Sequence, residues 1–415
     1  MTRYFPCVLS MLLCVLAVSC TTARHAQPQL PSDVRMNSDA GLGNLLILTI
    51  HLEDGEELPV VMDTGDELTC LDKSLEGKLG KPRGTETAHH FGDKLRAHAY
   101  TAPRLYLGQT LLKKSGLHGS YVVTIDCTNV FSGESRPIMG ILGMDILRNY
   151  CIQLDFNARQ VRFLDAAHSD KQNWGTAFRL TKSGACFTVR SSLAGTNSPP
   201  SLIDTGDLGD GWLTPTAFER WTNQTKVAKI SDPWGPTLAW LTGLKNDRIC
   251  GETIHDAPGP GPFHFSNATL NGLDYSNVDL SVTPSQKVNG IGLLLLARNL
   301  VTLDFPHRKM YLKQMSCKPL FDESENMQEG FKFLINLLDM HGLPGLPEHW
   351  AGNVNYSFPD RAYPFSGTFV FTEKGQPSTF HYAATKASGD SAWKLMKAWK
   401  SDPSGNIVKE YPIAN

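Results

Sequence analysis

The sequence predicts a mainly β protein with two homologous lobes and a small C-terminal α+β domain. Short apolar runs separated by Gly, Pro and Asp begin near residue 45, and such runs are typical of strands joined by turns. Several elements occur twice in the same order, which indicates an internal duplication. This pattern ends after Cys317, where a helix-like stretch and further strand-like runs follow.

The composition is that of a globular protein. The chain has 415 residues, of which 41% are hydrophobic and 19% charged, so it is long enough for two or three domains with their own cores. It carries 39 Lys and Arg against 41 Asp and Glu, a formal net charge of −2. Proteins that bind nucleic acid usually need an excess of basic residues to neutralise phosphates. We therefore expect no nucleic-acid partner.

The first 19 residues have the pattern of an export signal. Arg3 gives a positive start, and Val8–Val18 form an apolar run that is too short to span a bilayer. The run ends in Leu16-Ala17-Val18-Ser19-Cys20, which resembles a bacterial lipobox, in which the Cys is acylated and becomes the mature N-terminus. We therefore expect residues 1–19 to be a lipoprotein signal peptide. Lipid on Cys20 would anchor the protein in the bacterial cell envelope, at the outer membrane or the periplasmic face, and ordinary secretion is the alternative.

Four runs in the first half of the chain predict strands. They are rich in β-branched and other apolar residues and are bounded by turn-forming residues. These runs are Leu46–Ile50, Leu58–Met62, Tyr121–Ile125 and Gln160–Leu164.

Two repeated motifs define the lobes. Asp-Thr-Gly-Asp occurs at 63–66 and again at 204–207, a separation of 141 residues. Leu-Asp-Phe occurs at 154–156 and at 303–305, a separation of 149 residues. The same order and nearly equal spacing indicate two homologous lobes, the second with an eight-residue insertion.

These repeats set the expected domain boundaries. Residues 20–40 are polar and contain two prolines, so we expect a tether between lipid and protein. Lobe 1 is then 41–166, and lobe 2 is 174–316. Residues 320–415 form the C-terminal accessory domain.

The C-terminal domain is expected to combine one helix with several strands. Apolar residues at helical spacing predict a helix over Phe331–Met340, and strands are predicted at Gly367–Phe371, Thr379–Ala384 and Trp393–Trp399. The even spacing of Trp393 and Trp399 predicts that both rings pack on one face of the last strand. This domain contains no recognisable catalytic motif.

Export would permit disulfides among the six cysteines beyond the lipobox. These are Cys70, Cys127, Cys151, Cys186, Cys250 and Cys317. Six cysteines allow 15 pairings, and the sequence does not choose among them. Cys151 lies in an apolar run and can equally be a buried free thiol.

The two Asp-Thr-Gly loops, each following an apolar strand, resemble the active-site loops of the pepsin and retropepsin family of aspartic proteases. A further element of that family, two apolar residues followed by Gly, is matched by Ile141-Leu142-Gly143 in lobe 1. Its counterpart in lobe 2 is Gly290-Ile291-Gly292, in which Gly290 breaks the apolar pair. The resemblance covers residues 42–315.

The resemblance implies a bilobal pepsin/retropepsin-like acid-protease fold in which Asp63 and Asp204 face one another across a cleft. It also implies an aspartic-type endopeptidase whose partner is a polypeptide substrate in extended form. No metal or organic cofactor is implied. Because one chain carries both loops, we expect a monomer.

The residue types also suit this chemistry. Peptide hydrolysis by water needs one group that accepts a proton and one that donates a proton, and two carboxyl groups held close together can do both because they share a proton. Hydroxyl groups of Thr64 and Thr205 can hold the loops by hydrogen bonds. Gly65 and Gly206 allow close approach of the backbone.

Asp66 and Asp207 depart from the family pattern, which usually has Ser, Thr or Ala after the Gly. Four carboxyl groups near one cleft allow four outcomes. The enzyme works only when acid protonates the outer pair; the outer pair points away without effect; the site is inactive; or the four carboxylates bind a hard cation such as Ca²⁺. The third outcome corresponds to the alternative function, a catalytically inactive peptide-binding or envelope-structural lipoprotein that retains the fold, and Gly290 also favours this alternative.

Two further expectations concern the cleft. The family covers its cleft with a β-hairpin flap, and the Gly-containing stretch 89–93 lies at a suitable distance after Asp63. His89 and His90 in this stretch are expected to be solvated residues of the turn rather than ligands. Trp212, soon after the second loop, is expected in the core of lobe 2.

Overall fold

The computed structural model describes residues 29–90, 93–115, 120–131, 136–191, 199–225, 263–284, 286–321, 333, 354–357, 365–372, 379–388 and 391–413. The predicted signal peptide, Cys20 and Cys250 therefore lie outside the described residues, as does all of the predicted helix Phe331–Met340 except Phe333.

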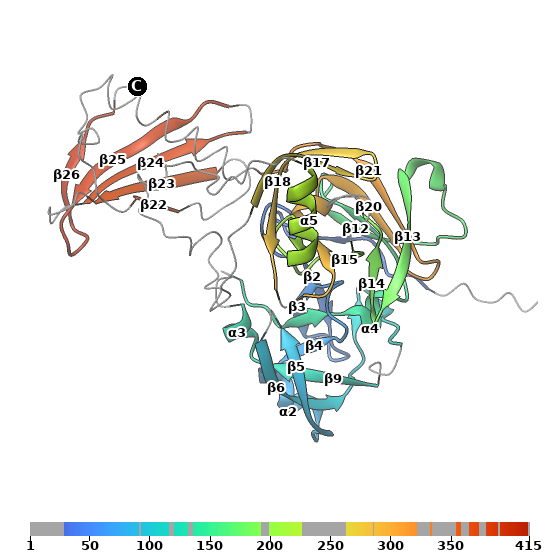
Figure 1. Cartoon of the computed structure of the whole chain (residues 1–415). Helices are drawn as coiled ribbons and strands as arrows, with labels where there is room; N and C mark the ends of the chain where they lie inside the picture. The colour runs from blue at the N-terminus through green and yellow to red at the C-terminus, as the bar shows by residue number, and fades with distance from the viewer. Residues whose placement is uncertain are drawn as a thin grey trace, which may run out of the picture.

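The protein is mainly β, as predicted, and its two largest sheets have nine strands each (Figure 1). All four strands predicted in the first half of the chain begin and end within one residue of their expected bounds. Lobe 1 denotes residues 41–166, and lobe 2 denotes residues 174–316.

The first sheet consists of lobe 1 strands. Its order is β5-β6-β9-β4-β10-β3-β2-β7-β8. The strands are β2 (Ile47–His51), β3 (Glu57–Met62), β4 (Cys70–Asp72), β5 (Gly84–His90), β6 (Asp93–Thr101), β7 (Tyr106–Leu107), β8 (Thr110–Leu111), β9 (Tyr121–Ile125) and β10 (Gly140–Leu142).

The second sheet joins the two lobes. Its order is β1-β12-β11-β20-β21-β13-β14-β15-β19. The strands are β1 (Val34–Arg35), β11 (Cys151–Asp155), β12 (Gln160–Leu164), β13 (Thr176–Ser183), β14 (Cys186–Val189), β15 (Ser201–Ile203), β19 (Asn289–Ile291), β20 (Asn299–Asp304) and β21 (Lys309–Gln314).

The repeated Leu-Asp-Phe strands meet at the junction of the lobes. β11 pairs antiparallel with β20, so that Leu154 lies opposite Val301. Gln153 and Thr302, which occupy equivalent positions of the two repeats, are joined by a 3.0 Å hydrogen bond from Nε2 to Oγ1. The duplication seen in the sequence is therefore also a pairing of equivalent strands in space.

The expected tether is shorter than residues 20–40. β1 pairs with β12, with Val34 opposite Val161, and Met36 and Ala40 are buried. Burial of these apolar side chains stabilises this segment within the fold, whereas in a solvated linker they would be exposed to water. The fold therefore begins no later than Val34.

The helices in the described part of residues 41–316 are short, with one exception in lobe 2. They are the 3₁₀ helices η1 (Lys73–Leu75) and η2 (Lys171–Asn173) and the α-helices α2 (Glu76–Leu79), α3 (Cys127–Val130), α4 (Met144–Leu147), α5 (Pro215–Thr225) and α7 (Leu293–Leu296). α4 and α7 each begin directly after the Gly of an apolar-Gly element. Among the described residues, no helix combines the length and apolar character that a membrane crossing needs.

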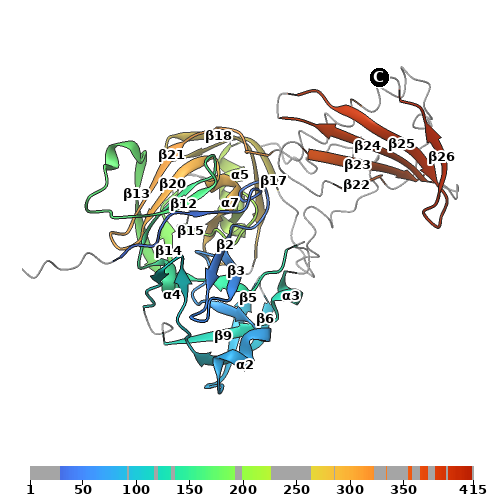
Figure 2. The same cartoon turned by 180° about the vertical axis from the view of Figure 1, so that it is seen from behind.

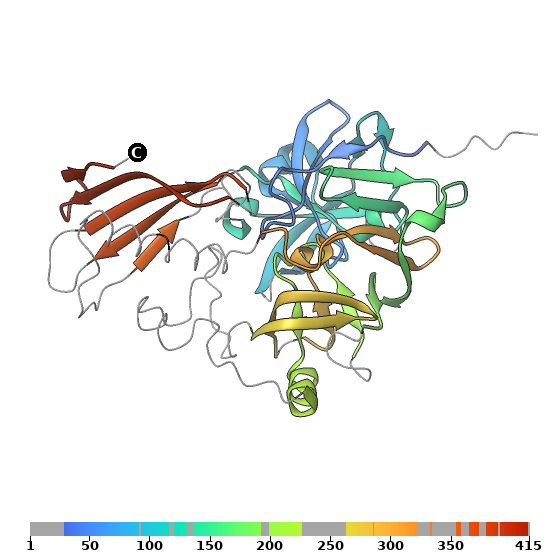
Figure 3. The same ribbon diagram turned by 90° about the horizontal axis from the view of Figure 1, so that it is seen from above.

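Lobe 2 carries an additional small sheet. Its strands are β16 (Trp212–Leu213), β17 (Phe263–Leu270) and β18 (Leu273–Val282), in the order β16-β18-β17. Figure 3 shows the β17–β18 hairpin in yellow beside α5.

The C-terminal part forms an antiparallel five-stranded sheet in which neighbouring strands follow one another in sequence (Figure 2). Its strands are β22 (Val354–Ser357), β23 (Phe365–Thr372), β24 (Thr379–Lys386), β25 (Lys394–Ser401) and β26 (Ile407–Tyr411). This arrangement contains the strands predicted for the accessory domain.

Trp393 and Trp399 do not share a face, contrary to expectation. The pairing of β24 with β25 skips Met396, which forms a β-bulge. An extra residue of this kind reverses the alternation of the side chains that follow it. Trp393 is buried, whereas Trp399 is half-buried and stacks on His381 at 4.8 Å between ring centroids.

The five described cysteines form no disulfide with one another. Cys127, Cys151 and Cys186 are buried thiols, and Cys317 is an exposed thiol. The thiol of Cys70 is buried and donates to the Leu68 carbonyl oxygen at 3.5 Å. The buried-thiol interpretation of Cys151 is confirmed.

Gly290, the residue that breaks the apolar pair in lobe 2, provides space for Trp212. A Cβ atom added to Gly290 would lie 2.2 Å from Cε3 of the Trp212 ring. Trp212 is buried, as expected, and its Nε1 donates to the Val288 carbonyl oxygen at 3.0 Å. The Trp212 indole occupies the space that a side chain at position 290 would fill. β19, which contains Gly290, still pairs in parallel with β15, so the apolar-Gly element of lobe 2 keeps its place in the sheet.

Gly290→Ala is therefore expected to destabilise the protein, because the new methyl group would overlap a buried and hydrogen-bonded ring. Overpacking of this kind costs about 1–3 kcal/mol. Gly77→Ala is the matched control, since a Cβ atom there meets nothing within 4 Å and the residue lies in α2. Urea denaturation should show a lower midpoint only for Gly290→Ala, and equal midpoints would contradict this packing.

Candidate active site

Each Asp-Thr-Gly loop leaves the end of a strand that pairs in parallel with an apolar-Gly element. Asp63 follows β3, which pairs with β10, and its amide donates to the Leu142 carbonyl oxygen at 3.1 Å. Asp204 follows β15, which pairs with β19, and its amide donates to the Ile291 carbonyl oxygen at 3.0 Å. The structure thus brings together the loops and the apolar-Gly elements that the sequence singled out.

Thr64 and Thr205 join the two loops reciprocally. The Thr64 amide donates to Oγ1 of Thr205 at 3.0 Å, and the Thr205 amide donates to Oγ1 of Thr64 at 3.1 Å. Each hydroxyl also donates across the lobes, Thr64 to the Ile203 carbonyl oxygen at 2.7 Å and Thr205 to the Met62 carbonyl oxygen at 2.6 Å. Both threonines are buried, so these four bonds fix one loop against the other without competition from water.

Two further bonds brace the lobe 1 loop from lobe 2. The Ala185 amide donates to Oε1 of Glu67 at 2.9 Å. The Cys186 thiol donates to the Gly65 carbonyl oxygen at 3.3 Å. The loop is therefore held from the β13–β14 hairpin as well as through Thr205.

This geometry places the carboxyl groups of Asp63 and Asp204 side by side, hydrogen-bonded to one another. Oδ1 of Asp63 accepts from the amides of Gly65 at 2.7 Å and Asp66 at 3.1 Å. Oδ1 of Asp204 accepts from the equivalent amides, at 2.9 Å and 3.2 Å. Backbone donors thus orient both carboxyl groups in the same way.

Glycine is required next to the carboxyl pair because each loop lies against the opposite Asp. A Cβ atom added to Gly65 would lie 2.4 Å from Cγ of Asp204. A Cβ atom added to Gly206 would lie 2.3 Å from Oδ2 of Asp63. Any side chain at either position would push the carboxyl groups apart.

Burial raises the pKa of both carboxyl groups above the ordinary value. The pKa of Asp204 lies well above that value, because the charges of Asp63 and Asp207 add to the effect of burial. At Asp63, amide hydrogen bonds from Gly65 and Asp66 oppose burial because they stabilise the ionised form. The pair therefore holds a shared proton, and its titration belongs to the two carboxyl groups together.

The outer carboxyl groups bind their own loops. Oδ1 of Asp66 accepts from the Leu68 amide at 3.1 Å, and Oδ1 of Asp207 accepts from the Gly209 amide at 3.1 Å. Burial, followed by the charge of Asp63, raises the pKa of Asp66 well above the ordinary value. The outer pair is therefore not without effect, because Asp66 and Asp63, like Asp207 and Asp204, are close enough for the charge of one carboxyl group to raise the pKa of the other.

No group of three or more His, Cys, Asp or Glu residues in the described part of the chain is arranged to hold a metal ion. The cation-binding alternative for the four aspartates therefore has no support from the geometry.

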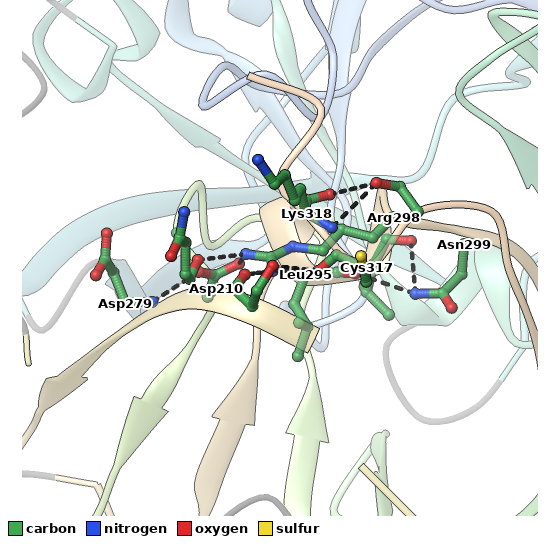
Figure 4. Close-up of polar contacts among 12 residues, drawn as sticks. Asp210, Asp279, Leu295, Arg298, Asn299, Cys317 and Lys318 are labelled. Atoms are coloured by element: carbon green, nitrogen blue, oxygen red, sulfur yellow. Dashed lines mark hydrogen bonds and ion pairs between the residues drawn. The ribbon is translucent and has the colours of Figure 1, made fainter. Parts of the chain in front are cut away.

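Behind the lobe 2 loop lies a buried ion pair that sequence reasoning missed (Figure 4). Nη2 of Arg298 lies 2.6 Å from Oδ1 of Asp210, and the side chains of both residues are almost completely buried. The Asp279 amide donates to Oδ2 of Asp210 at 2.8 Å. Burial raises the pKa of Asp210 to about 7, although Arg298 favours the ionised form.

The equivalent place in lobe 1 uses different residues, which sequence reasoning also missed. Oδ1 of Asp145, on α4, accepts from the amide of Thr69 at 2.9 Å and from its hydroxyl at 2.6 Å. Thr69 and Asp210 occupy equivalent positions, 141 residues apart. An Asp within an apolar run, as in Met144-Asp145-Ile146-Leu147, was the available signal, because such a residue needs buried partners.

The predicted flap is a β-hairpin in the structure. β5 and β6 pair antiparallel up to His90 and Asp93. The tip, Phe91 and Gly92, lies outside the described residues, so a covering role for this hairpin stays a prediction.

No model of a known protein family matches the sequence, and no curated protein matches it significantly.

Thr64→Val and Thr205→Val are each expected to destabilise the protein by about 2–4 kcal/mol, because each change leaves a buried amide and a buried carbonyl without their partner. Val has the shape of Thr, so packing is kept. The corresponding Ser variants retain the hydroxyl and are the controls. Chemical denaturation should separate Val from Ser at both positions, and equal stability would show that the reciprocal bonds contribute little.

Asp204→Asn is expected to make stability less dependent on pH. The folded pKa of Asp204 is raised, so its stabilising contribution is fully present below the unfolded value of about pH 4 and is lost as pH rises toward the folded pKa. The unfolding free energy of the wild type minus that of Asp204→Asn should therefore fall between about pH 4 and pH 7. Parallel curves from denaturation at several pH values would contradict the raised pKa.

Proposed function

We propose that the protein is an aspartic-type endopeptidase with a pepsin/retropepsin-like bilobal fold. The observation that carries this proposal is the hydrogen-bonded pair of Asp63 and Asp204, one from each of two equivalent loops. Amide donors orient both carboxyl groups, and the Thr64–Thr205 bonds hold the loops in register. An arrangement that forces two carboxyl groups to share a proton suits general acid–base catalysis better than it suits stability.

In this mechanism Asp63 is the base and Asp204 the acid. Asp63 takes a proton from a water molecule while the water oxygen attacks the carbonyl carbon of the scissile peptide bond. Asp204 gives its proton to the carbonyl oxygen, which yields a neutral tetrahedral intermediate. Asp63 then returns its proton to the leaving nitrogen as the C–N bond breaks, and Asp204 takes back the proton of a hydroxyl group.

The substrate would be an extended polypeptide segment lying between the lobes and held partly by backbone hydrogen bonds, as an added strand is. The two loops belong to one chain, so no second copy is needed to complete the carboxyl pair. Attachment to the bacterial cell envelope through Cys20 remains part of the proposal.

The rival function, an inactive peptide-binding or envelope-structural lipoprotein, rests on Asp66, Asp207 and Gly290. The outer carboxyl groups accept bonds from their own loops, and the space beside Gly290 is filled by Trp212. Neither feature displaces the carboxyl pair, so the geometry favours the enzyme.

Asp63→Asn and Asp204→Asn should each reduce peptide cleavage by at least about a thousandfold, because neither single carboxyl can both accept and donate the protons. The measurement is cleavage of a diverse peptide pool by the chain without its signal peptide, from about pH 3 to pH 7. Activity should be highest in acid and fall as the shared proton is lost.

The control for this experiment is Asp54→Asn, a carboxyl group outside both loops, in the turn before β3, whose side chain is 58% exposed. It should leave cleavage unchanged. Absence of cleavage by folded wild-type protein at every pH would overturn the enzyme assignment in favour of a binding cleft.

A further inference from the structure

Asp145 is a fully buried carboxyl group that the proposed reaction does not use. It lies on α4, two residues after Gly143, and its side chain is 0% exposed. Both bonds from Thr69 go to Oδ1. Oδ2 is buried and has no hydrogen-bond partner among the described residues. Burying a carboxyl oxygen without a hydrogen-bond partner destabilises a fold, so a residue retained in this state points to a specific role.

The Asp145–Thr69 contact connects to Asp63 by two short routes. Oγ1 of Thr69 accepts from the Gly143 amide at 3.2 Å, and Gly143 directly follows Leu142, whose carbonyl oxygen accepts from the Asp63 amide. By the second route, the Met144 amide donates to the Asp66 carbonyl oxygen at 2.9 Å, and the Asp66 amide donates to Oδ1 of Asp63.

The loop and α4 are in close contact at this point. A Cβ atom added to Gly143 would lie 2.6 Å from the Leu68 carbonyl carbon and 3.0 Å from the Thr69 nitrogen. A small shift of α4 would therefore move the loop that carries Asp63.

Lobe 2 holds its loop by other means. Residue 294, the equivalent of Asp145, is a half-buried Leu, and the loop is held through Asp210 by Arg298. The Arg298 guanidinium also donates to the carbonyl oxygens of Ser276 and Asn277, at 2.7 and 3.1 Å. The loops are joined to one another by the Thr64–Thr205 bonds, but the contact behind each loop differs: a Thr–carboxyl contact in lobe 1 and an ion pair in lobe 2.

We propose that Asp145 is the positioning residue for Asp63: its Oδ1 holds Thr69, and Thr69 holds the lobe 1 loop and the Gly143 amide in the geometry that places the Asp63 carboxyl group beside Asp204. This inference rests on the proposed function for its effect on catalysis but not for its effect on the loop.

The first measurement is hydrogen–deuterium exchange, which does not depend on activity. Asp145→Leu, which places in lobe 1 the residue type of lobe 2, should speed exchange at the Thr69 and Gly143 amides by about tenfold or more. Exchange at the Gly206 and Asp207 amides of the other loop should stay unchanged. Asp145→Asn keeps an acceptor for both Thr69 bonds and loses no bond at Oδ2, so it should behave like the wild type.

Two other variants complete the set. Thr69→Val removes the hydroxyl with little change of shape and should speed exchange at Gly143, which keeps the inference testable if Asp145→Leu does not fold. Leu294→Asn, at the equivalent half-buried position of lobe 2, is the matched control and should leave both loops unchanged.

The second measurement is steady-state peptide cleavage. Asp145→Leu should lower kcat by about tenfold to a hundredfold with KM changed less than about threefold, because misplacing a catalytic group weakens the transition state more than substrate binding. Asp145→Asn should restore kcat to within about threefold of the wild type.

The outcomes separate the two proposals. Unchanged exchange at Thr69 and Gly143 in folded Asp145→Leu would overturn the positioning role whether or not the chain cleaves peptides. Faster exchange in Asp145→Leu, together with no cleavage by the folded wild type, would support the role in the loop and refute the enzyme. Faster exchange with unchanged kcat would show that Asp145 holds the loop without positioning Asp63 for catalysis.

Discussion

The contact between the carboxyl groups of Asp63 and Asp204 is the constraint on which the surrounding structure depends. Two acids at hydrogen-bond distance and partly removed from water repel one another unless they share a proton, and they separate unless the backbone holds them. The amide donors, the Thr64–Thr205 bonds and the two glycines that face the opposite Asp all serve this requirement. Each contact is repeated in the other lobe, so the pair lies in a nearly symmetric environment.

The symmetry ends behind the loops. Lobe 1 fixes its loop with Thr69 and Asp145, whereas lobe 2 uses Asp210 and Arg298. Both solutions bury a carboxyl group, and each gives Oδ1 of that group a donor, because a buried charge without any donor would be destabilising. The two lobes thus hold equivalent loops with different residue types. As a result, the charges that surround Asp63 differ from those that surround Asp204.

The sequence predicted the features that depend on local pattern. Strands such as β9 and β12, the paired Asp-Thr-Gly loops and the apolar-Gly elements are each visible within a few residues. Features that depend on distant partners were not predictable: the space beside Gly290 has meaning only once Trp212 is packed against it, and the role of Arg298 requires Asp210. The opposite faces of Trp393 and Trp399 follow from one unpaired residue, Met396, which the alternation of side chains does not reveal.

The pairing of β11 with β20 has a consequence for how the chain can be divided. Strands of both lobes share one sheet, and a single apolar core includes side chains from each, such as Leu154 and Leu303. A fragment cut at the sequence boundary near residue 166 would expose the edge of β11 and half of that core to water, and open strand edges promote aggregation. The lobes are homologous in sequence but form one cooperative folding unit, so any ancestral single lobe would have needed a second copy to complete its sheet.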